Sequence, residues 1–256
     1  MFDTAIPSIE SYNIEMRKSL IDKVFFLDKI TAKVIVDYGC ADGSTIAFMK
    51  LMFPEYRYFG FDISEEMLNI ARQKVPGVDF YSDWKELRNA LIDLEDVAVV
   101  CNSLIHEVYA YGSPEDVKVF WSRIYDTEIF DWVVIRDMAV SDSVTRKADP
   151  LSVIRVRKAY DPQLLAQFER KWGSINENWP LVHFLLKYRY KTNWAREVNE
   201  NYLPISLEDL LGLIPDAWDP IYYNHYVLPF TRGTVHKDFN IDLQDPTHVQ
   251  LILKHK

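Results

Sequence analysis

Short apolar runs alternate with helical patterns over the first half of the chain. Buried strands are predicted from runs rich in β-branched and aromatic residues at 34–36, 56–61, 78–81, 97–101 and 132–135. Helices with one apolar face are predicted around these runs, over about 9–30, up to Lys50, after Ser64, over 84–91 and after Ser113. Strands and helices that alternate in this way typically build a parallel sheet with helices on both faces.

The alternation stops near Met138, and a different pattern follows. Beyond it, helices are predicted from Asp161-Pro162, over 181–190 and after Ser206, and two last strands are predicted over 221–228 and 249–253. We therefore expect one α/β domain. Its parts would be a cofactor-binding core over 1–139, a helical insertion over 140–204, and one last helix with two closing strands over 205–256.

Composition agrees with a single enzyme-sized domain and excludes several other classes. The 256 residues are 48% hydrophobic, enough for a sizeable core. The two cysteines, Cys40 and Cys101, do not make a disulfide framework, and no CxxC or HExxH pattern indicates a metal. The N-terminus lacks the layout of a signal peptide, and the apolar runs are too short for a membrane helix. We expect a cytoplasmic protein without a metal or membrane partner.

The charge is unevenly distributed. The net charge is −9, which disfavours indiscriminate binding to nucleic acid or anionic membrane. Residues 140–204, however, contain 11 Lys or Arg and only 7 Asp or Glu, whereas the other residues share 18 basic and 31 acidic side chains. A specific anionic partner held by the insertion is therefore compatible with the acidic total.

Candidate chemistry lies where the first two strands end. The first strand runs into Asp37-Tyr38-Gly39-Cys40-Ala41-Asp42-Gly43. Glycines in such a turn let a ligand approach the backbone, and the helix start that follows presents free N–H groups. Asp62, at the end of the second strand, can accept hydrogen bonds from both ribose hydroxyls. The alternative is that Asp37 and Asp62 cap local structure and that Asp83 is only solvated.

The turn resembles motif I of the class I S-adenosylmethionine-dependent methyltransferases, with Ala41 in place of the middle glycine. The resemblance covers about residues 30–140 and the last two strands. It implies a three-layer αβα sandwich, a seven-stranded, mostly parallel sheet of Rossmann-like type with an antiparallel seventh strand, and S-adenosylmethionine as cofactor. The cofactor contacts implied or expected beside the motif are Asp37, Gly39, Cys40, Ala41, Gly43, Asp62, Ile63, Met67, Ser82, Asp83, Trp84, Asn102 and Ser103.

Two other functions are alternatives to methyl transfer. A nicotinamide-dependent oxidoreductase needs G-x-G-x-x-G and a neutralised pyrophosphate, which Asp37 would oppose. A non-catalytic module that only binds the adenosyl cofactor would share every cofactor residue. Binding without turnover would identify the module.

The segment after the fourth strand narrows the choice of acceptor. Asn102-Ser103-Leu104-Ile105 stands where amino-directed nucleic-acid methyltransferases resemble one another in (N/D/S)PP(Y/F), so that class is disfavoured. Cys101 lacks the proline of a cytosine-C5 nucleophile, and a buried position is expected for it. The catalytic candidates are His106, as a general base or only a packed side chain, Glu107, which could orient it, and Asn102.

The acceptor is expected to be anionic, either a nucleotide or RNA element or a small metabolite, entering under the insertion. Arg136-Asp137, at the end of the fifth strand, could hold that anion or form a plain ion pair. Residues 179–194 mix cations with aromatics, which suits stacking on bases but equally suits a packed amphipathic helix. The candidate acceptor contacts are Arg136, Arg155, Arg157, Lys187, Arg189 and Tyr190.

Overall fold

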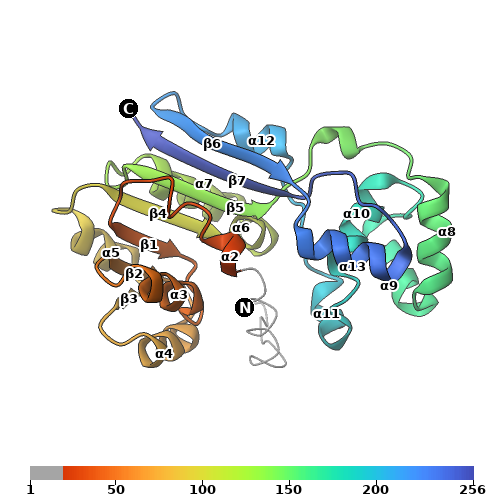
Figure 1. The fold of residues 1–256 in the computed structure, drawn as a ribbon, viewed down its shortest axis with the longest axis horizontal. Coiled ribbons are helices and arrows are strands. Elements are labelled where there is room, and N and C mark those ends of the chain that lie inside the picture. The colour runs from red at the N-terminus through yellow and green to blue at the C-terminus, as the bar shows by residue number, and fades with distance from the viewer. Residues whose placement is uncertain (1–19) are drawn as a thin grey trace. The chain divides into compact units, whose positions relative to one another are not determined.

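The computed structural model describes residues 20–256 (Figure 1). These residues form two compact units. The first, here called the sheet unit, contains the described chain up to Asp137 together with Pro215–Asn224 and Gln250–Lys256. The second, the helical unit, contains Met138–Ile214 and His225–Val249. It extends beyond the insertion predicted over 140–204.

Seven strands form one sheet in the order β3-β2-β1-β4-β5-β7-β6. Their bounds are β1 Val34–Tyr38, β2 Arg57–Phe61, β3 Asp79–Tyr81, β4 Val97–Asn102, β5 Trp132–Met138, β6 Trp218–Tyr226 and β7 His248–His255. β1 pairs in parallel with β2 and β4, β2 with β3, and β4 with β5. The β7 arrow points against those of β5 and β6 (Figure 1). The predicted sheet is confirmed.

Helices cover both faces of this sheet. Those of the sheet unit are α2 Leu20–Lys23, α3 Ser44–Met52, α4 Glu65–Lys74, α5 Trp84–Leu91, α6 Ile105–Tyr111 and α7 Pro114–Tyr125. Side chains alternate between the faces of a strand. On β1, Ile35 joins the apolar cluster that contains Ile46 of α3. Tyr38, on the other face, packs on Trp84 of α5 and Phe120 of α7. Helices therefore lie on both faces of the sheet, which is the three-layer αβα arrangement that was predicted.

The helices begin where the sequence provides a cap. The side chains of Ser64, Ser113, Asp161 and Ser206 each accept a hydrogen bond from the backbone N–H of a residue in the first turn. Such caps satisfy donors that have no partner inside the helix. All four predicted helix starts are confirmed.

Three helical predictions need correction. Of the helix expected over 9–30, residues 9–19 lie outside the described part, and the remainder ends at Lys23 and continues as turns. Helix α8, Pro150–Ala159, was not predicted, because exposed Leu151 and Ile154 blur its apolar stripe. Helix α13, Pro229–Phe239, was also missed, so 205–256 contains two helices rather than one.

The helical unit has its own hydrophobic core. Its elements are η1 Asp142–Val144, α8, α9 Pro162–Trp172, α10 Asn178–Lys187, η2 Lys191–Asn193, α11 Trp194–Glu197, α12 Leu207–Gly212 and α13. Phe168 and Phe184 are fully buried in a cluster that also contains Tyr160 and Phe239. The Tyr160 hydroxyl donates to the carbonyl of Tyr188 at 2.7 Å. The aromatics of α9 and α10 are thus used mainly in packing.

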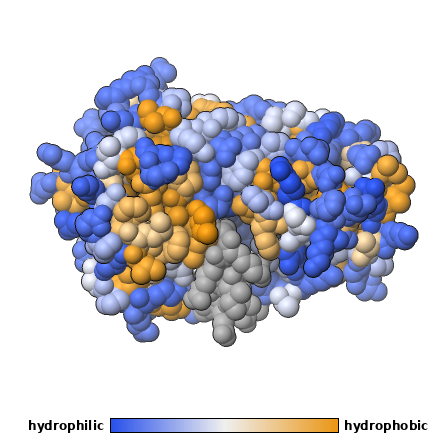
Figure 2. Space-filling model, viewed as in Figure 1, coloured by the Kyte–Doolittle hydropathy of each residue, from blue (hydrophilic) through white to orange (hydrophobic). Residues whose placement is uncertain are grey.

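Hydrophilic residues cover most of the face shown in Figure 2, interrupted by apolar groups. Ile21, Leu51 and Ile63 each keep 80% or more of their surface exposed. None of the helices formed within residues 20–256 combines the length and apolar character needed to cross a bilayer.

Ala41 adopts a left-handed backbone conformation with φ 45°, which is costly for a residue with a Cβ atom. We predict that Ala41→Gly raises the free energy of unfolding by about 0.5–1 kcal/mol, since the removed strain exceeds the entropy cost of glycine. Urea unfolding measures the change. Ala90→Gly, inside α5, is the matched control and should lower stability by about 1 kcal/mol. Equal losses in both variants would contradict the prediction.

Candidate cofactor and methyl-transfer site

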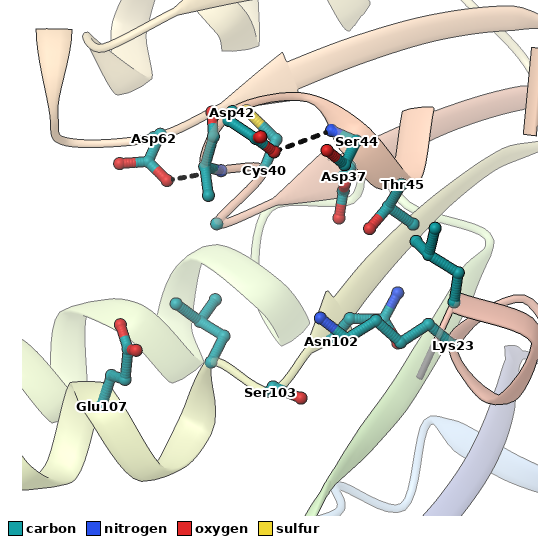
Figure 3. A pocket seen from close by; sticks show the side chains of 14 residues that line it. Lys23, Asp37, Cys40, Asp42, Ser44, Thr45, Asp62, Asn102, Ser103 and Glu107 are labelled. Carbon is teal, nitrogen blue, oxygen red and sulfur yellow. Dashed lines mark hydrogen bonds between the residues drawn. The ribbon is translucent and has the colours of Figure 1, made fainter. Parts of the chain in front are cut away.

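A pocket lies where β1, β2 and β4 end, at the carboxyl edge of the sheet (Figure 3). Ligands of open α/β sheets bind at this edge. The pocket is lined by Leu20, Lys23, Asp37, Gly39, Cys40, Ala41, Asp42, Ser44, Thr45, Asp62, Asn102, Ser103, Leu104 and Glu107. Seven of the predicted cofactor residues are therefore brought together: Asp37, Gly39, Cys40, Ala41, Asp62, Asn102 and Ser103.

The turn after β1 is fixed by backbone contacts. The N–H groups of Gly39 and Cys40 both donate to the carbonyl of Phe61, at 2.7 and 3.0 Å. Gly39 has φ +86°, and a Cβ atom there would lie 2.7 Å from Leu104 Cδ1. Glycine suits both the positive φ and the close approach of Leu104. This turn leads through Gly43, also at positive φ, into α3.

Asp62 is held by the two turns it joins. One carboxylate oxygen accepts from the N–H of Ala41 at 2.8 Å, and the other accepts from Ser64 at 2.9 Å. Burial raises its pKa, and the two backbone hydrogen bonds lower it. Each oxygen retains a further lone pair, as recognition of two ribose hydroxyls requires, and the residue lines the pocket. Asp62 thus supports local structure, as the alternative expected, and its contact with a ribose remains a prediction.

Two opposite charges are buried in the same pocket. Asp37 is 2% exposed and Lys23, from α2, is 3% exposed. Burial raises the pKa of Asp37 to about 7, opposed by the Lys23 charge. Burial, with help from Arg136, lowers the pKa of Lys23 to about 8. Sequence reasoning missed Lys23, because a lysine in an amphipathic helix gives no signal that it is buried.

The end of β4 contains a strained residue and an unsatisfied one. Within residues 20–256, neither the amide nitrogen nor the amide oxygen of Asn102 has a hydrogen-bond partner, although the side chain is buried. Ser103 has φ 54°, and its hydroxyl accepts from Arg136 at 2.9 Å. Unsatisfied buried amides and strained backbone are costly, and both are typical of ligand sites. Asn102 therefore offers a ligand one donor and one acceptor group.

His106 is oriented by Asp137. Its Nδ1 lies 2.6 Å from one oxygen of Asp137, whose other oxygen accepts from the N–H of Ile105, also at 2.6 Å. A carboxylate partner keeps the proton on Nδ1 and leaves Nε2 as the basic nitrogen. Glu107 lines the pocket, whereas His106, the residue before it in α6, is buried and is not among the lining residues.

Arg136 does not pair with its neighbour Asp137. Its Nε donates to Asp22 at 2.6 Å, and the side chain is 3% exposed. The expected ion pair with Asp137 is therefore replaced by one with Asp22 of α2, which the sequence did not suggest. Contact between Arg136 and an anionic acceptor remains a prediction.

Several predicted cofactor residues lie outside the pocket lining: Gly43, Ile63, Met67, Ser82, Asp83 and Trp84. Ile63 is 86% exposed. Asp83 is exposed and also caps α5 through the N–H groups of Lys85 and Glu86, a structural role that was not predicted. The Trp84 ring packs on Tyr38. Contacts from these six residues to the cofactor, including one from Asp83 to the adenine, remain predictions.

The candidate acceptor contacts of the helical unit are largely engaged within it. Lys187 is fully buried, donates to the carbonyls of Glu197 and Glu200, and was wrongly expected at a surface. Arg157 forms an ion pair with Glu169. The other three members of the set are also placed: Arg155 donates to the carbonyl of Asn240, Arg189 lies over the ring of Phe230, and Tyr190 is half-buried.

Comparison with known proteins agrees with this geometry. Residues 35–126 match the family model described as a methyltransferase domain. Trans-aconitate 2-methyltransferases from Acidovorax sp. (strain JS42) and Acidovorax ebreus (strain TPSY) are each 41% identical over 54 residues, covering 20% of this chain and 21% of theirs. The match thus spans about a fifth of the length of these curated relatives.

Solved structures extend the comparison to the whole fold. A S-adenosylmethionine-dependent methyltransferase from Anabaena variabilis ATCC 29413 superposes with a TM-score of 0.51 at 13% identity, over 100% of this chain and 99% of that one. Residues 35–126 therefore match a methyltransferase domain, and the described chain has the Rossmann-like fold of the class I S-adenosylmethionine-dependent methyltransferases. The expected cofactor, S-adenosylmethionine, is the one on which that solved neighbour depends.

We predict that Asp62→Ala weakens S-adenosylmethionine binding by roughly 30-fold or more, because charge-assisted hydrogen bonds to the ribose are lost. Isothermal titration measures the affinity, with NAD as a comparison ligand. Asp93→Ala, which removes an exposed acid beyond α5, is the control and should bind as the native protein does. Unchanged affinity in Asp62→Ala would remove the ribose assignment.

Proposed function

We propose that this chain is an S-adenosylmethionine-dependent methyltransferase whose acceptor is a small anionic metabolite. The observation that carries the proposal is the pocket at the carboxyl edge, where Asp62 suits a ribose and Asp37 and Lys23 suit an amino-acid group. The unsatisfied amide of Asn102 lies in the same pocket. When bound, the cofactor supplies an electrophilic methyl group that the acceptor attacks.

Engaged cations favour a small acceptor over RNA. Binding of a nucleic-acid backbone depends on several accessible Lys or Arg side chains that face phosphates. In the helical unit Lys187 is buried and Arg157 is ion-paired, so the excess of basic residues in the sequence does not translate into an equal excess of free cations. The curated relatives that match part of the chain are named for a small carboxylic acid acceptor, which supports the same choice.

The labelled-cofactor experiment tests this choice. The protein is incubated with methyl-labelled S-adenosylmethionine and with separate RNA, protein and metabolite fractions of a lysate. We expect label in the metabolite fraction, and retention of the labelled product on an anion exchanger. Label in RNA alone would overturn the acceptor proposal. Binding of the cofactor without label in any fraction would favour the non-catalytic module instead, and preference for NAD over the sulfonium would favour an oxidoreductase.

We further propose that His106 removes the acceptor proton during transfer to a hydroxyl or amine. The support is the buried pair with Asp137, which fixes the tautomer, and the position of His106 beside the pocket residue Glu107. A carboxylate acceptor is already nucleophilic and needs no base. The role of His106 therefore depends on the atom that is methylated.

For a hydroxyl or amine acceptor, His106→Asn should lower kcat by roughly 10²–10⁴-fold and leave cofactor affinity unchanged. The ionisation that the native enzyme shows in the pH profile of kcat/KM should disappear. Asp137→Asn should weaken turnover and shift that ionisation, as expected of a positioning residue. His236→Asn, at an exposed histidine in α13, is the control. Native turnover in His106→Asn would exclude a base role and indicate a carboxylate oxygen as acceptor.

A further inference from the structure

The pocket contains a buried cation that methyl transfer does not require. Lys23 is 3% exposed and lines the pocket together with Asp37 (Figure 3). Among the described residues, no hydrogen bond or ion pair engages the Lys23 ammonium, and none engages the Asp37 carboxylate. The two opposite charges attract each other, but within residues 20–256 neither makes a direct polar contact. Buried charges without such contacts are costly, so both groups indicate a ligand with charges of the opposite sign.

We propose that Lys23 binds the carboxylate of the cofactor's amino-acid tail, while Asp37 binds its ammonium group. The tail of S-adenosylmethionine is a zwitterion, with one group for each of the two buried charges. A ligand of this kind replaces the lost hydration of both side chains at once. The proposal rests on the pocket's cofactor and is independent of the acceptor proposed above.

The helix that contains Lys23 is held in place by polar side chains from distant parts of the chain. Its neighbour Asp22 accepts from Arg136 Nε at 2.6 Å. The side-chain amide of Gln250, in β7, donates to the backbone carbonyl of Asp22 at 3.2 Å and to its carboxylate at 3.1 Å. Because α2 has only four residues, these contacts rather than helix length fix the direction in which Lys23 points.

The charge state of the pair agrees with the proposed contact. Burial and the Arg136 charge lower the pKa of Lys23 to about 8, against the opposing effects of Asp37, Asp137 and Glu107. Burial raises the pKa of Asp37 to about 7. The mutual attraction of the two side chains favours their charged forms, which are the forms that bind a zwitterion. A bound carboxylate would raise the pKa of Lys23, and a bound ammonium would lower that of Asp37.

Ligands that lack one part of the tail test the proposal. Isothermal titration compares S-adenosylmethionine, S-adenosylhomocysteine, decarboxylated S-adenosylmethionine and 5′-methylthioadenosine, which has no amino-acid tail. In Lys23→Met we expect roughly tenfold or greater loss of affinity for the first two ligands, because a charge-assisted hydrogen bond is lost. Affinity for the last two should change less than about twofold, since they never contact Lys23. Lys33→Met, at the exposed residue that precedes β1, should leave all four unchanged.

Two results would overturn the proposal. One is unchanged affinity of Lys23→Met for S-adenosylmethionine. The other is an equal loss for all four ligands, which would mean that Lys23 only supports the pocket. Circular dichroism checks that the variant folds. If it does not, the native protein decides: it must prefer S-adenosylmethionine to its decarboxylated form by roughly tenfold or more, and equal affinities would refute the contact. Since no acceptor is present, these results do not depend on methyl transfer.

Discussion

A buried guanidinium connects the parts of the sheet unit that form the pocket. Arg136, at the carboxyl end of β5, is almost fully buried, and such a charge is tolerated only with partners of good geometry. Its partners are Asp22 of α2 and the Ser103 hydroxyl at the end of β4. One side chain therefore ties together a helix near the start of the described chain and two central strands. The walls of the pocket depend on that connection.

The main features of the fold were predictable because they depend on local patterns. Apolar runs with helices between them define the parallel strands, and acids at the strand ends define the ligand edge. Asp37 and Asp62 were found in this way and both line the pocket. The helix starts at Ser64 and Ser113 were equally visible, because a cap and the turn it satisfies lie within a few residues.

The missed features depend on contacts between residues far apart in the chain. His106 meets Asp137 across 31 positions, and Arg136 meets Asp22 across 114. No short motif records such pairs. The burial of Lys187 could not be predicted either, because in the sequence it is one cation in a segment of mixed cations and aromatics, whereas in the structure it is fully buried. Composition determines the net charge of residues 140–204. The number of cations that a partner can reach depends on the fold, and it is smaller than the sequence suggests.

The two units share strands, and this has a consequence for how the molecule can be divided. The chain passes between them after Asp137, Ile214, Asn224 and Val249, and three of these four crossings lie inside the strands β5, β6 and β7. The helical unit is therefore not a single loop that one deletion could remove. A version reduced to the sheet unit needs two new linkers, both joined to strands. Unfolding of either unit removes residues from β6 and β7, so the thermal transitions of the two units are mechanically coupled.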